Sequence, residues 1–306
     1  MSDSLKQIKL SNRSNSTIRN TAYLMHPTNR NKIIIFPSHQ QIQAAINWLE
    51  KYHPVNPDLE YALNLVIEGK IVPDKTGELV AISYKPSINQ KVTPDNIQGA
   101  MMINSQNTQT SFESCDKITT QTLFSLVKKC GLPNKIITSS QVKQWIRPLM
   151  LEHYPIEKEY DQLVMICTQS LLNGKGRWAT LQDKPALIAY EQAYIAERGN
   201  GNLNRDWNTL IQKRQIAVLE HCDQIASVVR YNPTGNYALV VAPFTFPEFR
   251  RQGFARQLLA FLTKELLQEY AALKLWVDEE NIPAIALYNS LGFKQIGSCY
   301  TGYFSK

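Results

Sequence analysis

The stretch from Tyr237 to Phe293 constrains the fold of this chain more than any other part of the sequence. An apolar run at 237–241 predicts a strand, a basic turn with a glycine follows at 245–255, and residues Arg256 to Tyr270 have a helical pattern. A second apolar run, 273–277, predicts another strand. Such a turn leaves backbone N–H groups unpaired at a helix N-terminus, where the helix dipole favours anions. The stretch therefore predicts an α/β fold with a phosphate-binding turn.

The length and composition set the scale of the protein. A chain of 306 residues with 43% hydrophobic residues can form two globular domains. No apolar run is long enough to span a bilayer, and the first residues lack the basic and apolar segments of a secretory signal. We therefore expect a cytoplasmic protein without a membrane partner.

The positive charge is concentrated at the N-terminus. The net charge of the chain is +7, and the segment 1–32 contains most of its excess of basic over acidic residues. Residues 1–30 are predicted to be a flexible basic tail or an irregular lead-in strand. Because the remainder is close to neutral, the charge argues against nucleic acid as a partner, although binding through this tail stays a third hypothesis.

The cysteines favour neither a metal site nor a disulfide framework. Five cysteines are widely spaced and form no C-x-x-C pair. Reduced, buried thiols are the preferred interpretation, and no metal is expected.

The N-terminal half alternates predicted strands and helices without a phosphate-binding turn. Elements alternate through 33–168, as in an α/β layered fold. The predicted helix 119–130 has no glycine-rich turn before it, and Glu113 and Asp116 stand where a phosphate would be repelled. The turn-forming residues 173–176 are predicted to be a linker.

The motifs of the C-terminal half resemble a known superfamily. Arg250-x-x-Gly253-x-Ala255 lies between a predicted strand and a helix, and Asn281 and the run Leu287-Tyr288-x-x-Leu291-Gly292-Phe293 follow. Together these motifs resemble the GCN5-related N-acetyltransferase (GNAT) superfamily, in its FR47-like branch. The resemblance implies a mixed, mostly antiparallel twisted sheet flanked by helices, with central strands that splay apart.

The order of elements extends this resemblance to the whole chain. The N-terminal half resembles a degenerate copy of the same fold, so tandem GNAT-like domains are predicted. The boundaries expected are 31–172 for the degenerate domain and 177–306 for the catalytic domain.

The resemblance also implies a site for acyl-CoA, with acetyl-CoA as the default donor and no metal. Its residues are expected to be Phe244, Thr245, Arg250, Arg251, Gln252, Gly253, Phe254, Ala255, Arg256, Asn281 and Tyr288. Glycine at 253 has no Cβ, so the backbone can approach a pyrophosphate closely. The alternative is an ordinary strand–helix turn with solvated basic side chains.

Catalytic roles are less constrained than CoA binding. Tyr288 matches the tyrosine that protonates the departing CoA thiolate in many members of the superfamily; the alternative is a tyrosine that only packs beside the sulfur. Asn281 is expected either to contact the pantetheine arm or to cap the last helix. Glu220 is the general base predicted here, with His221, Asp278 and Glu279 or a water chain as alternatives.

The acceptor is predicted to bind beside the segment 197–207. Arg198, Asp206 and Trp207 are the candidate lining residues, although a loop tryptophan is equally typical of a core anchor. A small-molecule amine, an amino acid and a peptide or protein amine all remain open as acceptors, and a homodimer is among the assemblies left open.

The leading hypothesis is an acyl-CoA-dependent N-acyltransferase in which a neutral amine attacks the thioester directly. Direct attack is preferred because the motif region contains no cysteine that could carry the acyl group. A non-catalytic CoA-binding sensor or a protein-interaction module is the alternative.

Overall fold

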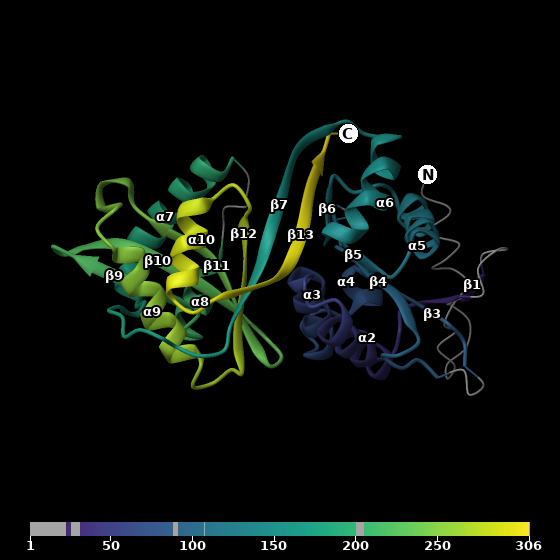
Figure 1. The fold of residues 1–306 in the computed structure, drawn as a ribbon, viewed down its shortest axis with the longest axis horizontal. Coiled ribbons are helices and arrows are strands. Elements are labelled where there is room, and N and C mark those ends of the chain that lie inside the picture. The colour runs from purple at the N-terminus through teal and green to yellow at the C-terminus, as the bar shows by residue number, and fades with distance from the viewer. Residues whose placement is uncertain (1–22, 26–30, 88–90, 107, 200–204, 306) are drawn as a thin grey trace. The chain divides into compact units, whose positions relative to one another are not determined.

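A computed structural model describes residues 23–25, 31–87, 91–106, 108–199 and 205–305 of the chain. The described chain divides into two compact units (Figure 1). The N-terminal unit runs to Leu163 and includes the last segment, from Gly297 onward, whereas the C-terminal unit comprises Val164–Ile296. The predicted basic tail or lead-in strand, 1–30, lies mostly outside the described residues, of which Tyr23–Met25 form a strand.

The N-terminal unit alternates strands with helices. Its elements, in chain order, are β1 (Tyr23–Met25), β2 (Lys32–Ile35), α2 (His39–Tyr52), α3 (Pro57–Ile67), α4 (Pro73–Thr76), β3 (Leu79–Tyr84), β4 (Ile97–Ile103), β5 (Gln109–Ser114), α5 (Lys117–Cys130), β6 (Lys135–Ser139), α6 (Ser140–Leu151), the first part of β7 (Ile156–Cys167) and the last part of β13 (Lys294–Phe304). Local signals explain the main helices. Ser38 forms a capping box with Gln41 at α2, and Asp116 accepts a hydrogen bond from Thr119 N at α5.

The sheet of the N-terminal unit separates two layers of helices. Its strand order is β1-β2-β3-β4-β5-β6-β13-β7, with only β5 and β6 running parallel among the registered pairs. Alternate strand residues enter opposite cores: Ile34, Ile82 and Met102 pack with α2 and α3, whereas their neighbours pack with α5 and α6. This period-2 alternation buries both faces of the sheet.

The C-terminal unit has the same order of main elements. It contains β8 (Arg177–Trp178), the 3-10 turn η1 (Leu181–Asp183), α7 (Lys184–Arg198), α8 (Trp207–Gln212), β9 (Ile216–His221), β10 (Gln224–Thr234), β11 (Tyr237–Thr245), the 3-10 turn η2 (Pro247–Phe249), α9 (Phe254–Leu266), β12 (Ala272–Asp278) and α10 (Ile282–Ser290). Its strand order is β7-β12-β11-β10-β9-β8. Helices α7 and α8 share a core with β9, β10 and β11.

The fold confirms the predicted mixed, mostly antiparallel sheet flanked by helices. Two local boundaries differ from those expected. The helix predicted to begin at Arg256 begins at Phe254, because Gly253 ends the turn in the left-handed region. The strand predicted at 177–182 ends at Trp178, because Thr180 and Asp183 form a capping box that starts a helical turn.

The segment predicted to be a linker is held against a helix. A Cβ placed on Gly174 would lie 2.0 Å from the backbone oxygen of Gln257 and 2.3 Å from the backbone nitrogen of Phe261. Lys264 also donates to the side chain of Asn173 at 2.9 Å. Glycine is therefore required at 174 for close packing on α9. The domain boundaries inferred from the sequence, 31–172 and 177–306, stay a prediction.

Candidate functional site

The C-terminal half of β11 is bent by a β-bulge. Strand β10 pairs Val228 with Phe244 and Arg230 with Val241, so Ala242 and Pro243 together oppose Val229. Ala242 has φ of 50°, and its carbonyl accepts a hydrogen bond from the Tyr190 hydroxyl at 2.7 Å. A proline without an N–H is accommodated here because a bulge already interrupts the ladder.

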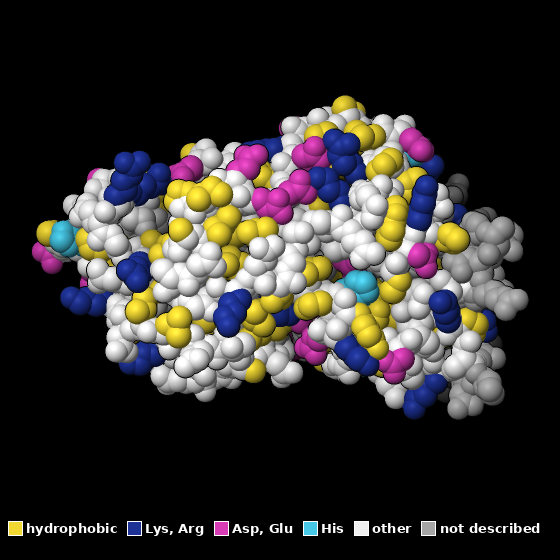
Figure 2. Space-filling view, viewed as in Figure 1, with side chains coloured by type: hydrophobic (Ala, Val, Ile, Leu, Met, Phe, Trp, Pro, Cys, Tyr) yellow, Lys and Arg dark blue, Asp and Glu magenta, His cyan; other side chains and the backbone are white. Residues whose placement is uncertain are grey.

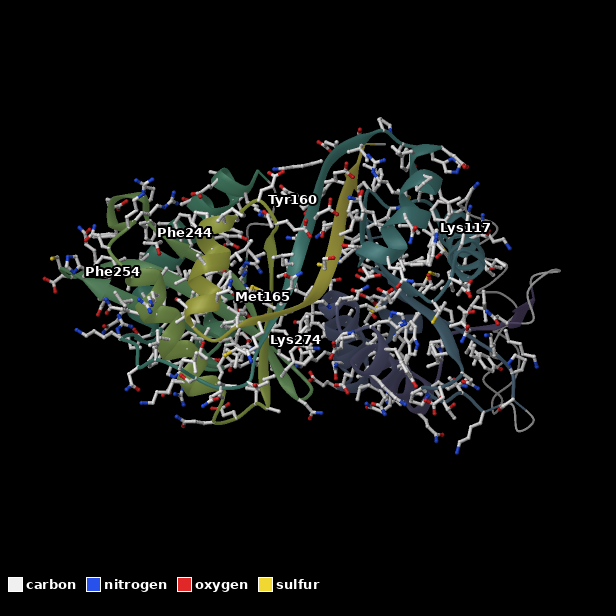
Figure 3. All side chains as sticks on the ribbon, in the orientation of Figure 1. Lys117, Tyr160, Met165, Phe244, Phe254 and Lys274 are labelled. Atoms are coloured by element: carbon white, nitrogen blue, oxygen red, sulfur yellow. The ribbon has the colours of Figure 1, made fainter. Side chains whose placement is uncertain are left out.

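Strands β11 and β12 separate beside this bulge. Their parallel register joins Tyr237–Leu239 to Ala272–Lys274, and β11 continues to Thr245 and β12 to Asp278 without further registered pairs among the described residues. Splayed central strands were predicted for this domain, and the structure has them. Figure 3 labels Phe244, on the separated part of β11, and Phe254, at the beginning of α9.

The turn after β11 presents unpaired backbone N–H groups. Gly253 has φ of 82° and provides no side-chain cap to α9, and Arg251 is also left-handed, with φ of 62°. Among the described residues, none accepts a hydrogen bond from the N–H groups of 251–256. A Cβ placed on Gly253 would meet no atom within 4 Å. The turn is thus an uncapped helix N-terminus that faces open space, the arrangement that binds phosphate oxygens.

The side chains of the turn differ in how far they are engaged. Arg250 donates to the carbonyl of Thr245 at 2.9 Å and to Glu197 at 2.5 Å, and its guanidinium lies over the Phe244 ring. Gln252 donates to the Glu248 carbonyl at 3.1 Å. These two predicted CoA residues therefore fix the turn to its surroundings.

The remaining predicted residues of the turn are arranged differently. The side chains of Arg251 and Arg256 are exposed, and Ala255 lies in the first turn of α9. The ring of Phe254 lies 4.9 Å from that of His221 and 6.1 Å from that of Phe249. This aromatic cluster anchors the beginning of α9 to the end of β9.

Tyr288 lies in α10 with its hydroxyl free of protein partners. The residue is 5% exposed, and no described residue forms a hydrogen bond with its hydroxyl. The hydroxyl is also not one of the fully sealed polar atoms, so it keeps contact with solvent. Burial raises the pKa of Tyr288, with smaller contributions from Tyr194 and Asp278. The phenol is therefore protonated at neutral pH and can donate a proton.

The predicted acceptor residues fall into different environments. Arg198, at the end of α7, forms a bidentate ion pair with Asp278 of β12, one contact of which is 3.1 Å. Asp206 caps α8 by accepting from Thr209 N at 3.1 Å, and Trp207 is a core residue with 4% exposure. Only Arg198 is connected with the surroundings of Tyr288, through Asp278.

The other two predicted residues have structural contacts. Glu220 forms an exposed ion pair with Arg177 at 2.6 Å, and Arg177 also pairs with Asp183. Asn281 accepts a hydrogen bond from Ala284 N at 3.2 Å and so caps α10. The pantetheine role of Asn281 and the base role of Glu220 stay predictions.

Three residues where α7 covers β10 and β11 were not predicted from the sequence: Tyr190 and Tyr194 in α7 and Arg230 in β10. Tyr190 holds the bulge, Tyr194 lies with its ring 6.3 Å from that of Phe244, and Arg230 is 7% exposed on β10. A charged residue in an otherwise apolar strand pattern was the available signal for Arg230.

Two features are absent from the described residues, a metal-binding cluster and a membrane-spanning helix. No group of three or more His, Cys, Asp or Glu residues in the described ranges could hold a metal ion. No helix in the described part of the chain is long and apolar enough to cross a membrane. On the face shown in Figure 2, Lys and Arg side chains of the coloured residues are interspersed with other types.

Comparisons with known proteins agree with this architecture. The solved structure of a protein from Drosophila has a TM-score of 0.60 to this chain at 11% identity, and the match covers 87% of this chain and 97% of that chain. A GCN5-related N-acetyltransferase from Sphaerobacter thermophilus has a TM-score of 0.59 at 15% identity, covering 90% and 95% of the two chains. A GNAT-family acetyltransferase from Colwellia psychrerythraea has a TM-score of 0.54 at 15% identity, covering 90% and 100%. These similarities show a shared fold.

A family model locates the resemblance in the sequence. Residues 225–301 match the model described as FR47-like protein, which spans the strands and helices from β10 into β13. This match over 225–301 and the fold shared with the solved structures agree with the resemblance to the GNAT superfamily, in its FR47-like branch, that the sequence motifs indicate. None of the curated proteins compared with the chain matches it.

Proposed function

We propose that the protein is an acyl-CoA-dependent N-acyltransferase, with acetyl-CoA as the donor and an amine as the acceptor. The observation that carries this proposal is the uncapped turn at 251–256, whose unpaired N–H groups face open space beside two splayed strands. A pyrophosphate needs such donors, and a pantetheine arm needs an extended groove with free strand edges. The FR47-like match over the same elements supports this proposal.

The chain can assist the chemistry through Tyr288. The attacking amine forms a bond to the thioester carbon, and the carbon–sulfur bond breaks, which leaves a thiolate. Tyr288 is protonated at neutral pH, as a phenol ordinarily is, and burial raises its pKa further. Its hydroxyl has no competing partner among the described residues. We assign it the role of the general acid that protonates the thiolate.

The amine must lose a proton before it attacks. Glu220 is the base predicted from the sequence, but it is an exposed group paired with Arg177. The charge of Asp278 raises the pKa of both Tyr194 and Tyr288, and its carboxylate forms an ion pair with Arg198. We therefore propose Asp278 as the better-placed residue for accepting or relaying this proton.

We infer that the N-terminal unit is a degenerate GNAT-like copy. It has the same succession of strands and helices, including a parallel pair, β5 and β6, that is registered only at 109–111 and 135–137. Asp116 caps its helix α5: the carboxylate accepts a hydrogen bond from Thr119 N, occupies a donor that a phosphate would need and repels an anion.

A CoA titration of the wild-type protein and Gly253→Glu tests the proposed function. The variant places a carboxylate among the phosphate-binding N–H groups and strains a position with φ of 82°. We expect wild-type binding in calorimetry and an affinity loss of at least about 100-fold in the variant, which corresponds to about 2.7 kcal/mol.

Gly69→Glu is the matched control. Gly69 also has a positive φ, 72°, and a Cβ there would meet nothing within 4 Å, but it lies in the N-terminal unit. It should bind CoA as the wild type does. Equal binding by wild type and Gly253→Glu would contradict the assignment of the site.

A non-catalytic CoA sensor is the second candidate, favoured by the ion pairs that engage two of the four candidate bases, Glu220 and Asp278. Free-thiol release from acetyl-CoA across a panel of amines separates the two functions. Binding of CoA without release of thiol for any amine would favour the sensor.

A further inference from the structure

Arg230 is a buried cation without a carboxylate partner. It lies in β10 opposite Val241, beside the bulge of β11, and is 7% exposed. Among the described residues, its side chain forms one hydrogen bond, in which Nε donates to the Tyr190 hydroxyl at 3.4 Å. No described residue forms an ion pair with it, and the sequence of 200–204, outside the described residues, contains no acidic residue. Burying a charge in this way costs free energy unless an anion compensates it.

The guanidinium group is not sealed from solvent. The terminal nitrogens of Arg230 have no hydrogen-bond partner among the described residues, yet they are absent from the set of fully buried polar atoms that lack one. They therefore keep contact with solvent. Since Arg donates through a planar fork that matches a carboxylate, these nitrogens are suited to a bidentate anionic ligand.

The neighbouring charges leave Arg230 as the cation in excess. Arg205 pairs with Glu191 at 2.9 Å, and Arg198 pairs with Asp278. Arg230 lowers the pKa of Tyr194, against the larger effect of burial, and so lies close to the ring that also borders Phe244. With both carboxylates of this neighbourhood paired, one positive charge remains for a ligand.

We propose that Arg230 binds a carboxylate group of the acceptor, so that the acceptor is a small amine of the amino-acid class. This inference rests on the proposed function and names its substrate. A carboxylate matches the single excess charge better than a phosphate dianion does. Its amine would lie toward β11, where the bulge at Ala242 and the ring of Phe244 border the splayed strands.

Matched acceptors test the proposal. Amino acids, the corresponding decarboxylated amines and phosphoethanolamine are compared as acceptors, with thiol release from acetyl-CoA as the readout. We expect kcat/KM to be about 30-fold higher for an amino acid than for its decarboxylated partner, as for a hydrogen-bonded charge pair. R230M should remove this preference by raising KM, and its affinity for CoA should equal that of the wild type.

Unfolding distinguishes a ligand-binding arginine from a structural one. R230M replaces an unpaired charge by an apolar side chain of similar length, so its unfolding midpoint should equal or exceed that of the wild type. R205M leaves the buried Glu191 unpaired, so its midpoint should fall. A lower midpoint for R230M, with unchanged acceptor preference, would overturn the proposal in favour of a structural role.

The remaining outcomes are also decisive. Turnover without preference for carboxylates, or with a preference for phosphoethanolamine, overturns the carboxylate assignment while the acyltransferase function stands. Absence of both CoA binding and turnover is a failure of the proposed function. In that case, thermal unfolding with amino acids and without CoA tests the role of Arg230. A higher unfolding midpoint with amino acids in the wild type, but not in R230M, supports the carboxylate site. No rise in the midpoint of the wild type overturns it.

Discussion

Each unit has a pair of parallel strands that is registered over three residues only, β5 and β6 in the N-terminal unit and β11 and β12 in the C-terminal unit. The opening beyond the registered residues is bridged in one unit and not in the other. In the N-terminal unit, the gap beyond the registered part of β5 and β6 is bridged by Glu113. Its carboxylate accepts hydrogen bonds from the hydroxyl of Ser139 at 2.8 Å, from Ser139 N at 3.2 Å and from Asn56 at 3.3 Å. In the C-terminal unit, no described carboxylate bridges β11 and β12. One opening is thus bridged by a buried carboxylate, and the other, among the described residues, is not.

The helices beside the two openings show the same contrast. Helix α5 starts at Asp116, which accepts from Thr119 N at 2.7 Å, whereas α9 starts at Gly253 without a side-chain cap. Seven residues after the cap, α10 has Tyr288, and α6 has Ile146 in the hydrophobic core. Under the proposed function, these few differences between the two units restrict acyl-CoA binding and protonation of the departing thiolate to the C-terminal unit.

The largest expected effect concerns the residue that distinguishes α10 from α6. Tyr288→Phe should lower kcat by about 100- to 1,000-fold, because a general acid contributes about that much, and should leave CoA affinity unchanged. Tyr154→Phe, which removes a phenol hydroxyl from the N-terminal unit, is the control and should retain full turnover. Unchanged kcat in Tyr288→Phe would mean that the tyrosine only packs beside the sulfur.

A smaller effect is expected at Glu113. Burial raises the pKa of this carboxyl group to about 7 against its hydrogen bonds. Because its pKa is raised, Glu113 holds a proton more tightly in the folded state than in the unfolded state. The resulting contribution of Glu113 to the free energy of unfolding is complete below pH 4.5, its ordinary pKa, and is lost as pH rises through 7. The stability deficit of Glu113→Gln relative to the wild type should therefore shrink by about 1–3 kcal/mol between pH 5 and 8.

Chemical denaturation at several pH values measures this deficit. His53, whose pKa is lowered by burial and whose Nδ1 lies 3.5 Å from Glu113, is present in both proteins, so its own titration largely cancels. Glu159→Gln is the control: Arg147 lowers the pKa of Glu159, so its contribution is lost only in more acidic solution. A deficit for Glu113→Gln that stays constant from pH 5 to 8 would contradict the bridging role assigned to a protonatable carboxyl.

The smallest effect concerns Cys115, the residue before the cap of α5. Its thiol lies 3.7 Å from His53 Nε2, but burial and the neighbouring acids raise its pKa to about 11. Because the thiolate is the reactive form, iodoacetamide at pH 8 should modify Cys115 at least about tenfold more slowly than the exposed Cys222. Mass spectrometry of partly alkylated protein gives both rates, and equal rates would show an activated thiol in the N-terminal unit.

The sequence allowed the elements to be predicted well where signals are local. Ser38, Gly253 and the apolar runs of β3 and β4 act within a few residues, so the capped helix, the turn and the two strands could be foreseen. The resemblance to GNAT motifs placed the turn and Tyr288.

The features that escaped prediction depend on contacts between distant residues. Glu113 was expected to repel a phosphate, but nothing near it in the sequence indicates that Asn56 and Ser139 supply donors to it. Arg230 likewise needs α7 and β11 in place before its lack of a partner can be recognised. Local pattern could not indicate either, because each depends on pairing across the fold.

The last strand has a consequence for how the protein is made. Residues Cys299–Tyr303 pair with Lys135–Ser139 of β6, and Phe304 enters the core formed by α5 and α6. These residues follow the whole C-terminal unit in the chain, so during synthesis the edge of β6 remains unpaired until translation has passed Ile296. The N-terminal unit can therefore begin to form first, but it is completed only after the whole C-terminal unit has been synthesised.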